Sequence, residues 1–317
     1  HADKGDYTTV LMQGSGTFGV ESVLSSVISS TDKVLVLQNG AYSKRMVEMC
    51  DYHGIKYVVY EEDYAHVPDP AIVEDVLKSD GNITHISMVH SETTSGLLND
   101  IAAIGELAKK YNKKFIVDAM SSFGGVDINV SELSITYLVS SANKCIQGVP
   151  GFSFIIAKVS DLKQTKGIAR SLSLDLYAQW ETMEKDGGKW RFTSPTHVVA
   201  AFSQALKELT AEGGITARNA RYTATNRALR KGMEELGFKA YIDEAHQGPI
   251  ITTFFYPENC KFTFEKMYAY LKDHGYVIYP GKLTDAETFR LGNIGEIYMD
   301  DVEKILGIFK DFVSAEN

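Results

Sequence analysis

The sequence predicts an α/β protein whose central sheet is mainly parallel and carries helices on both faces. Short apolar runs rich in β-branched residues alternate with longer segments of helical periodicity, which is the pattern of consecutive βα units. Hydrophobic residues make up 44% and charged residues 23% of the chain, as in ordinary soluble globular proteins. Its 317 residues exceed the length of about 250 to 300 residues at which a single core usually stops growing, so we expect two domains.

The first half of the chain supplies most of the predicted sheet. Strands are expected at residues 8–12, 33–37, 55–60, 83–89, 114–118, 136–141 and 152–157. Helices are expected at residues 18–29, 42–53, 70–79 and 101–112. The last helix carries Ile101, Ile104 and Leu107 at helical spacing and ends in lysines, where cations suit the helix dipole.

The second half predicts a smaller α/β domain. Residues 194–236 are strongly helical, with a break at Glu212-Gly213-Gly214. Further strands are expected at 249–256, 276–280 and 287–292, and further helices at 262–274 and 300–314. We therefore expect a large domain over residues 1–210 and a small C-terminal domain over residues 211–317.

Charge and cysteine content narrow the class of partners and the compartment. The net charge of -9 provides no basic surface for nucleic acid or an anionic membrane, and no run reaches the ~18 apolar residues of a membrane span. The three cysteines show no C-x-x-C spacing and no secreted disulfide pattern, which indicates a reducing cytoplasm. His1 lies only a few residues before the first strand, so we expect a segment upstream of it.

The loop after the first strand reads MQGSGTFG over residues 12–19 and matches the G-x-G-x-x-G spacing of dinucleotide-binding loops. Backbone N–H groups and a helix dipole meet there, and Ser15 and Thr17 add hydroxyl groups, so the loop suits a phosphate. A glycine-rich turn without a ligand explains the same residues equally well. NAD binding also requires an acid at the end of the second strand, and that strand ends in Gln38. The absence of Gly-Lys-Ser/Thr excludes a Walker loop.

Two later strands lead into charged residues. Asp118 ends one apolar strand, and Lys144 follows the next one. In open α/β sheets ligands bind beyond the carboxyl ends of the strands, so both residues are expected to share a crevice with the glycine loop. Alternatively, Asp118 caps a turn and Lys144 is a solvated lysine. Together, a phosphate loop, an acid and a lysine match pyridoxal phosphate, whose aldehyde bonds to a lysine and whose ring nitrogen needs a carboxylate.

Several runs carry a resemblance to a known family: GSGTFGVESVLSS, NGAYSKRMVEM, MVHSETTSG, VDAMSSFGG, SSANKCIQGVPGFSF, SLSLDLYAQW, KWRFTSPTH and FRLGNIGE. They resemble the 2-aminoethylphosphonate–pyruvate group of the class V aminotransferases, which have the pyridoxal-phosphate-dependent transferase fold of type I. The resemblance extends from the first strand to the end of the chain. It implies transfer of an amino group from 2-aminoethylphosphonate to pyruvate, giving phosphonoacetaldehyde and L-alanine in phosphonate degradation, with pyridoxal 5′-phosphate as cofactor.

The resemblance also implies a role for individual residues. Lys144 would bind the cofactor covalently and then move a proton, and Asp118 would pair with the pyridine nitrogen. The phosphate-binding turn matches Ser15, Gly16 and Thr17. Tyr42 matches an aromatic side chain that stacks on the pyridine ring, and Thr93 matches a residue near the phenolic oxygen of the cofactor.

Two further matches concern the substrate and a partner subunit. Arg290 matches an arginine that receives the acidic group of the substrate, and Thr193 matches a residue that reaches the cofactor phosphate of the other subunit. The resemblance therefore implies a homodimer with shared active sites. From the residues alone, a salt bridge would also explain Arg290, and core packing would also explain Tyr42.

Other functions remain open at this point. An alanine–glyoxylate or serine–pyruvate aminotransferase of the same family is the main alternative. A cysteine desulfurase is disfavoured because Asn143, not His, precedes Lys144 and no reactive-cysteine loop is evident. A non-catalytic binding module on this fold is a further possibility. Members of the family carry a longer amino-terminal segment with a Pro-Gly-Pro motif near the active site, which this sequence lacks.

Overall fold

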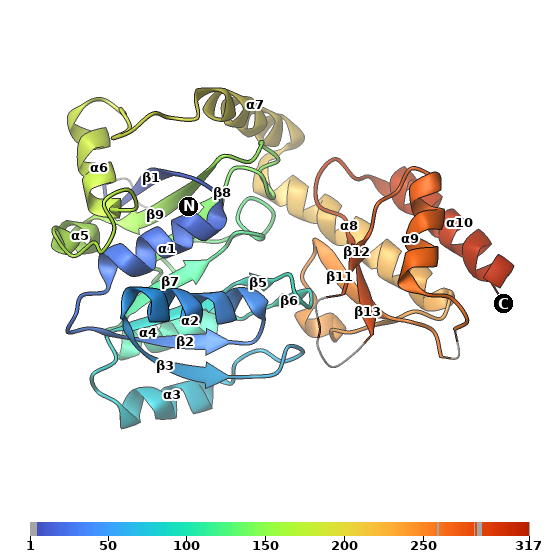
Figure 1. Ribbon diagram of the computed structural model, residues 1–317, viewed down its shortest axis with the longest axis horizontal. Coiled ribbons are helices and arrows are strands. Elements are labelled where there is room, and N and C mark those ends of the chain that lie inside the picture. The colour runs from blue at the N-terminus through green and yellow to red at the C-terminus, as the bar shows by residue number, and fades with distance from the viewer. Residues whose placement is uncertain (1–4, 259, 282, 284–286, 317) are drawn as a thin grey trace.

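The computed structural model describes residues 5–258, 260–281, 283 and 287–316 (Figure 1). The elements form two parts, each built around its own sheet. The amino-terminal part contains a seven-stranded sheet, and the carboxyl-terminal part contains a four-stranded sheet. None of the helices within these residues is long and apolar enough to cross a membrane.

The large sheet is mainly parallel, as the sequence predicts. In spatial order its strands are β1 (Tyr7–Gln13), β9 (Phe152–Lys158), β8 (Tyr137–Ser141), β7 (Lys114–Asp118), β4 (His85–Val89), β2 (Lys33–Gln38) and β3 (Lys56–Glu61). All neighbours from β8 to β3 are parallel, whereas β9 runs antiparallel to both β1 and β8. The carboxyl ends of the five parallel strands therefore meet at one edge of the sheet.

Helices cover both faces of this sheet because its strands are apolar on both sides. The longer helices of this part are α1 (Gly16–Val27), α2 (Ala41–His53), α3 (Pro70–Ser79), α4 (Ile101–Lys110) and α6 (Leu176–Lys185). Val34 and Val36 of β2 lie in a core with α1, α2 and α6. Leu35 and Leu37 lie in a second core with α3 and α4. This alternation follows from the two-residue period of a strand and confirms the predicted layers.

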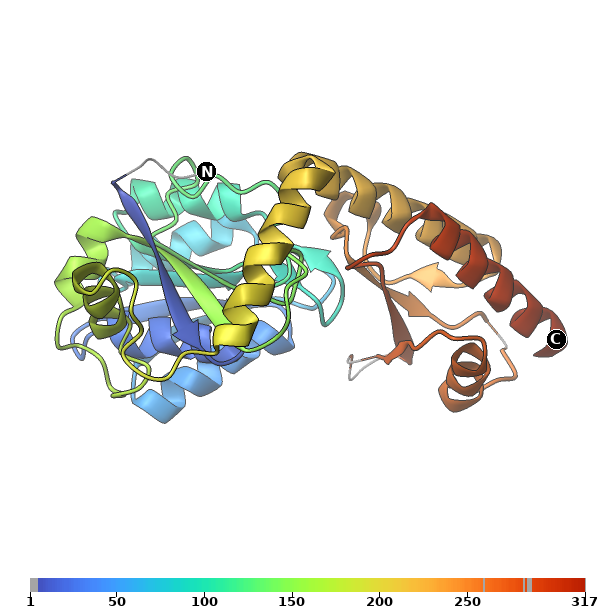
Figure 2. The same ribbon diagram turned by 90° about the horizontal axis from the view of Figure 1, so that it is seen from above.

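The small part follows a pair of helices, α7 (Thr196–Glu212) and α8 (Gly214–Glu235), that meet at an angle (Figure 2). Gly213 lies between them with φ of 109°, a left-handed conformation that favours glycine. The remaining elements are β10 (Lys239–Ala240), β11 (Ile251–Phe255), α9 (Phe264–Asp273), β12 (Tyr279–Pro280), β13 (Thr288–Gly292) and α10 (Met299–Glu316). We propose a domain boundary near residue 210, and the helix break at Gly213 supports it.

The small sheet is antiparallel, with the strand order β10-β11-β13-β12. Phe254 of β11 and Phe289 of β13 are fully buried and pack against α8, α9 and α10. Aromatic pairs dominate this core; for example, the ring centroids of Phe238 and Phe289 are 5.4 Å apart. The core fixes the orientation of β13, which carries Arg290.

Some elements were not predicted. They are β5 (Ser91–Glu92), β6 (Leu97–Leu98), α5 (Val159–Leu162), the 3₁₀ turns η1 (Lys163–Thr165) and η2 (Glu244–His246), and also α6 and β10. Strands of two residues are too short to show a period, so the sequence pattern cannot indicate them. The predicted strand at 276–280 is reduced to the last two of its residues, Tyr279–Pro280.

Candidate active site

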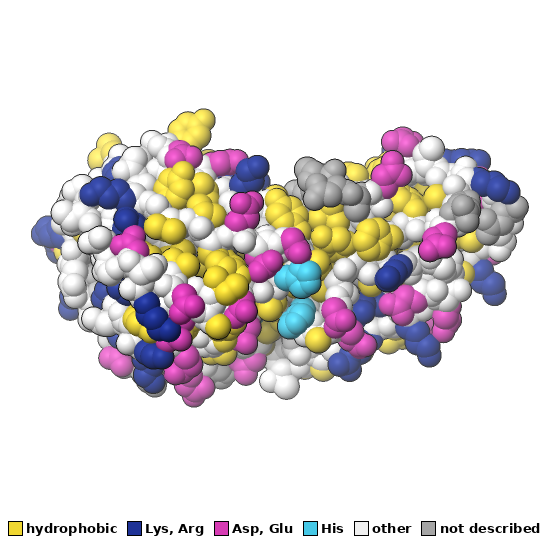
Figure 3. All heavy atoms as spheres, turned by 90° about the horizontal axis from the view of Figure 1, so that it is seen from below, with side chains coloured by type: hydrophobic (Ala, Val, Ile, Leu, Met, Phe, Trp, Pro, Cys, Tyr) yellow, Lys and Arg dark blue, Asp and Glu magenta, His cyan; other side chains and the backbone are white. Residues whose placement is uncertain are grey.

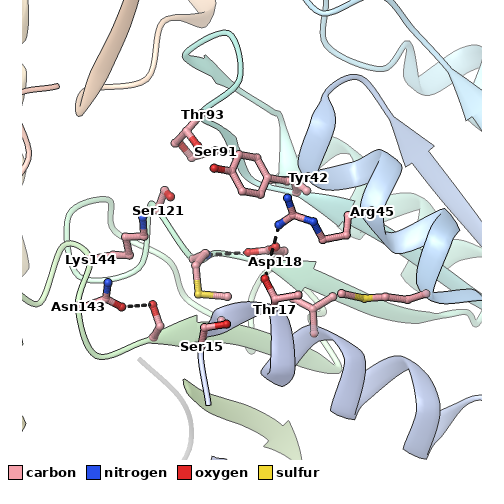
Figure 4. Close-up of a pocket in the computed structure, with 16 residues that line it drawn as sticks. Ser15, Thr17, Tyr42, Arg45, Ser91, Thr93, Asp118, Ser121, Asn143 and Lys144 are labelled. Atoms are coloured by element: carbon pink, nitrogen blue, oxygen red, sulfur yellow. Dashed lines mark hydrogen bonds between the residues drawn. The ribbon is translucent and has the colours of Figure 1, made fainter. Parts of the chain in front are cut away.

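A cavity of about 230 Å³ opens at the carboxyl ends of the parallel strands (Figure 4). Most of the predicted site residues line it: Ser15, Gly16, Thr17, Tyr42, Thr93, Asp118 and Lys144. Figure 4 shows Lys144 at one edge of this group of side chains and Asp118 near its centre, between Tyr42 and Arg45 on one side and Thr17 on the other. The topology of the sheet thus brings together residues from five separate regions of the chain.

The glycine loop forms the start of α1 and one wall of the cavity. The helix begins at Gly16, two residues earlier than predicted, and the side chain of its cap, Ser15, makes no capping hydrogen bond. The side chain of Met120 packs directly against Gly16, and a Cβ at this position would displace its thioether end. The first N–H groups of a helix have no partner within it and bind anions readily.

Asp118 ends β7 and is buried beneath the cavity, with only 7% of its surface exposed. Its Oδ1 accepts a hydrogen bond of 2.9 Å from the backbone N–H of Met120, so the residue does cap a turn. Burial raises the pKa of this carboxyl from 3.8 to about 7, and Glu92 adds to the shift, while Arg45 and Lys144 oppose it. Within the described residues no cation forms an ion pair with Asp118. A cationic ligand atom in the cavity would stabilise its ionised form.

Lys144 lies in a tight turn after β8. The turn is closed by backbone hydrogen bonds of 2.8 Å from Gln147 N–H to the carbonyl of Lys144 and from Gly148 N–H to the carbonyl of Ala142. The side chain is half-buried, and its Nζ makes no hydrogen bond or ion pair with any residue that the structure describes. The lysine is therefore not a solvated loop residue, because its amine lines the cavity and is free to react.

A second cavity of about 260 Å³ continues from Lys144 toward the small part of the molecule. Lys144, Tyr42 and Thr93 line both cavities, and Arg290 and Tyr279 line only the second. The two cavities therefore adjoin at the lysine. A substrate in the second cavity would have access to Lys144 and to a cofactor in the first.

Arg290 lies in the middle of β13 and is 5% exposed. Its Nε donates to the carbonyl of Pro280 at 3.1 Å, and one Nη donates to the carbonyl of Thr93 at 2.9 Å. The guanidinium also lies 5.7 Å from the centre of the Tyr279 ring. No described carboxylate pairs with it, so a salt bridge within the described chain does not explain this arginine. Burial lowers its pKa, which an anionic ligand would offset.

Two residues of this site were missed at the level of sequence. Arg45 lies one helical turn after Tyr42, its guanidinium is 5.1 Å from the Tyr42 ring centre, and it donates to Thr17 Oγ1 at 3.5 Å (Figure 4). The i,i+3 spacing of the two residues on α2 was the available signal. Arg45 thus connects the aromatic wall of the cavity with the glycine loop.

Glu92 is the second missed residue and is fully buried. It accepts hydrogen bonds from the hydroxyl of Thr94 at 2.6 Å and from the backbone N–H of Ser43 at 3.3 Å. Its carboxyl therefore lies at the start of α2, where a negative charge is favourable. Gly40 must be glycine because a Cβ there would clash with this carboxyl. Glu92 holds the end of α2 that carries Tyr42.

Thr193 does not line either cavity. It is exposed and lies in the segment before α7, beside Phe192, whose side chain is 50% exposed. The predicted contact of Thr193 with the cofactor of another subunit stays a prediction.

Comparison with known proteins identifies the family. The model of the family described as "Aminotransferase class-V" matches residues 3–284. The chain belongs to the class V aminotransferases. It is 54% identical, over 99% of its length and 86% of the relative's, to 2-aminoethylphosphonate–pyruvate transaminase of Lysinibacillus sphaericus. It is 55% identical to the Klebsiella pneumoniae protein of the same name, over 95% of this chain and 82% of the relative.

A longer relative combines two activities in its name. The bifunctional phosphonoacetaldehyde hydrolase/aminoethylphosphonate transaminase of Clostridioides difficile is 56% identical over 97% of this chain, which covers 48% of that protein. The chain thus spans about half of this relative and more than four fifths of the two single-function ones.

Solved structures agree with the fold. Pyridoxamine–pyruvate aminotransferase from Mesorhizobium loti superposes with a TM-score of 0.89 at 25% identity. The match covers 97% of this chain and 79% of the Mesorhizobium loti chain. An aspartate aminotransferase from Thermus thermophilus superposes with a TM-score of 0.87 at 22% identity. That match covers 98% of this chain and 85% of the Thermus thermophilus chain. These similarities confirm the predicted transferase fold.

Pyridoxal 5′-phosphate, the cofactor of class V aminotransferases, fits the residues of the cavity. The unpaired buried carboxyl of Asp118 suits a protonated pyridine nitrogen, and the free amine of Lys144 suits an aldehyde. The backbone N–H groups at the start of α1, which have no partner within the helix, suit the phosphate.

Proposed function

We propose that this chain transfers the amino group of 2-aminoethylphosphonate to pyruvate, with pyridoxal 5′-phosphate as cofactor, giving phosphonoacetaldehyde and L-alanine. One observation carries the proposal: Lys144 and Asp118 flank a single cavity in a chain more than half identical to transaminases named for this reaction. The same similarity favours this reaction over the alanine–glyoxylate and serine–pyruvate alternatives.

The residues around the cavity would hold the cofactor as follows. Lys144 forms the covalent bond, and Asp118 accepts a hydrogen bond from the protonated ring nitrogen. Backbone N–H groups at Gly16 and Thr17, with the Ser15 hydroxyl, bind the phosphate. Tyr42 would pack against the cofactor, and Arg45 lies against the Tyr42 ring. Thr93 would complete the wall of the cavity beside it.

When bound, the cofactor supplies an electron sink conjugated with the carbon that carries the amino group. The amine of Lys144 would accept the proton from this carbon and would donate it on the cofactor side of the same system. Asp118 keeps a proton on the ring nitrogen throughout, which stabilises the negative charge as it develops. Burial of Asp118 excludes water that would screen this interaction.

Arg290 would bind the acidic group of the substrate. A buried guanidinium that has only carbonyl partners retains N–H groups for an oxyanion, and its planar fork matches two oxygens of a phosphonate or of the carboxylate of pyruvate. The second cavity extends from Arg290 to Lys144. A substrate held by its acidic group at Arg290 would therefore place its amine near the lysine.

We also propose that the protein is a cytoplasmic homodimer with shared active sites. The exposed apolar residues Phe192 and Leu172, at 50% and 77% exposure, support a subunit interface near Thr193, whose side chain would reach the cofactor phosphate of the partner. Crosslinking and sedimentation of the purified protein would measure the dimer.

The decisive experiment is a comparison of amino donors. The spectrum of the loaded enzyme is recorded before and after adding 2-aminoethylphosphonate, and in parallel β-alanine, which presents a carboxylate in place of the phosphonate. Rapid loss of the cofactor's visible absorbance with the phosphonate alone is expected. Faster turnover with alanine and glyoxylate than with 2-aminoethylphosphonate and pyruvate would favour the alternative reaction, and no spectral change with any amine would indicate a binding module.

A further inference from the structure

A row of polar side chains on α8 faces inward, where a helix usually presents apolar residues. Asn219, Thr223, Asn226 and Arg230 recur at intervals of three or four residues and line one cavity, with Arg227 at its rim. The cavity has a volume of about 180 Å³. Polar lining of this kind suits a polar ligand rather than core packing.

The cavity lies between the two parts of the molecule. Leu98 and Val126 of the large part form one wall, and Glu244 and Pro249, from the connection between β10 and β11, form another. Within the described chain it shares no residue with either cavity that contains Lys144. It is therefore separate from the candidate active site.

Arg230 is the unusual residue of this cavity. It is 9% exposed, its Nε has no hydrogen-bond partner, and its guanidinium forms no hydrogen bond or ion pair with any residue the structure describes. Arg218 on the same helix shows the usual arrangement: it is 1% exposed, pairs with Glu212 at 2.6 Å and donates to the carbonyl of Cys145. A buried guanidinium without a partner is strongly unfavourable, so Arg230 favours an anion, which no residue in the described part of the chain provides.

The charges around the cavity favour an anion. Arg227 lies one helical turn before Arg230, is exposed at the rim, and likewise has no ion pair within the described residues. Glu244 is the one carboxylate among the lining residues and is exposed. Two guanidinium groups and one carboxylate leave a net positive charge, and the arginine fork matches two oxygens of one anion.

We propose that this cavity is an anion-binding site that takes a small oxyanion, a phosphate or carboxylate group, on Arg230 with Arg227 at the rim. A ligand there contacts residues of both parts of the molecule and stabilises their contact. The site is independent of the reaction proposed above, since none of its residues holds the cofactor or the substrate.

Thermal unfolding of the cofactor-loaded protein tests this site, with inorganic phosphate as the probe and sodium chloride at equal ionic strength as the reference. The loaded protein is used because its cofactor covers the phosphate-binding turn at Gly16. We expect phosphate to raise the Tm of the wild type and of Lys231→Gln, which removes an exposed charge from α8 without touching the cavity. We expect Arg230→Gln to lose this rise and to bind phosphate at least about tenfold more weakly by calorimetry.

A reversal of relative stability gives a second signature. In chloride, Arg230→Gln is expected to be at least as stable as the wild type, because the substitution removes an unpaired buried charge. In saturating phosphate the wild type is expected to be the more stable of the two. A lower Tm of Arg230→Gln in both buffers would show a structural role and overturn the proposal, as would a phosphate effect as large in the variant as in the wild type.

Two further measurements cover the remaining outcomes. If Arg230→Gln does not fold, Arg227→Gln replaces it, with weaker phosphate binding expected and unchanged binding contradicting the site. Acetate in place of phosphate distinguishes the ligand class: equal affinity indicates a carboxylate site, and preference for phosphate indicates a phosphate site. None of these readouts involves amino transfer, so their failure leaves the proposed reaction unaffected, and failure of that reaction leaves this site unaffected.

Discussion

The two parts of the molecule present opposite unpaired charges to the candidate active site. The large part contributes Asp118, a buried carboxylate, and the small part contributes Arg290, a buried guanidinium, and neither has an ion-pair partner in the described chain. Arg218, by contrast, is buried and paired with Glu212. Under the proposed function, the unpaired charges mark where ligand charges would lie: a protonated ring nitrogen against Asp118 and an acidic group against Arg290.

The two parts also position these charges differently. Asp118 and Lys144 follow neighbouring parallel strands, so the topology of the large sheet alone brings them to one edge. Arg290 lies within an antiparallel strand of the small part, and its side chain donates a hydrogen bond to the carbonyl of Thr93 in the large part. The surface between the two parts is hollowed, and hydrophobic side chains gather on both sides of this notch (Figure 3). Movement of the small part would thus change the substrate end of the site more than the cofactor end.

Lys144→Ala is expected to have the largest effect, because it removes both the covalent attachment and the proton carrier. The rate of steady-state transamination should fall at least about a thousandfold, and the visible absorption maximum of the bound cofactor should shift. Lys163→Ala, which removes an exposed lysine far from the cavity, serves as the control. Turnover within tenfold of the wild type would contradict the assignment of Lys144 to the cofactor end.

Asp118→Asn should lower kcat about a hundredfold, since an amide no longer holds a proton on the ring nitrogen. The same substitution tests the electrostatics of the large part. Because burial raises the pKa of Asp118 from 3.8 to about 7, the folded protein without cofactor binds more protons than the unfolded chain between these values. The stability that the protonated Asp118 carboxyl contributes is therefore lost progressively as the pH rises from about 4 through about 7.

Thermal unfolding of the cofactor-free protein across this pH range checks the sign. In Asp118→Asn the contribution is absent, so its Tm should fall less with rising pH than that of the wild type. Asp273→Asn, which changes an exposed carboxylate, should keep the wild-type slope. Equal slopes in Asp118→Asn and the wild type would mean that the buried carboxyl does not titrate in this way.

Arg290→Gln should affect the substrate end alone. The KM for 2-aminoethylphosphonate is expected to rise about ten- to a hundredfold from the loss of a charge-assisted bidentate contact, with the cofactor spectrum unchanged. Arg290→Lys keeps the charge without the fork and should recover only part of the loss. A changed cofactor affinity in Arg290→Gln would contradict the expectation that Arg290 of the small part acts only at the substrate end.

Arg45→Gln should have the smallest effect. Arg45 opposes the rise in the pKa of Asp118, so its removal should raise that pKa further and weaken cofactor binding a few-fold. Titration of the cofactor by absorbance measures the change, and Lys44→Gln, an exposed neighbour on α2, should bind the cofactor as the wild type does. Equal affinities in both variants would remove Arg45 from the site.

The sequence by itself determined the elements of the large sheet and the cofactor end of the cavity. Strand β7 and helix α3 lie where the pattern predicts them, and Gly16, Asp118 and Lys144 lie at strand ends that the parallel arrangement brings together. These features depend on local periodicity and on the regular geometry of βα units, both of which a single sequence contains.

Only the tertiary structure decided the rest. The antiparallel course of β9, the burial of Glu92 against Gly40, and the position of Arg290 opposite Lys144 depend on contacts between residues far apart in the chain. The same holds for Arg230, which reads in the sequence as an ordinary charged helix residue. Which charges are paired and which are left for ligands depends on which surfaces of the folded chain meet, and local pattern does not contain that information.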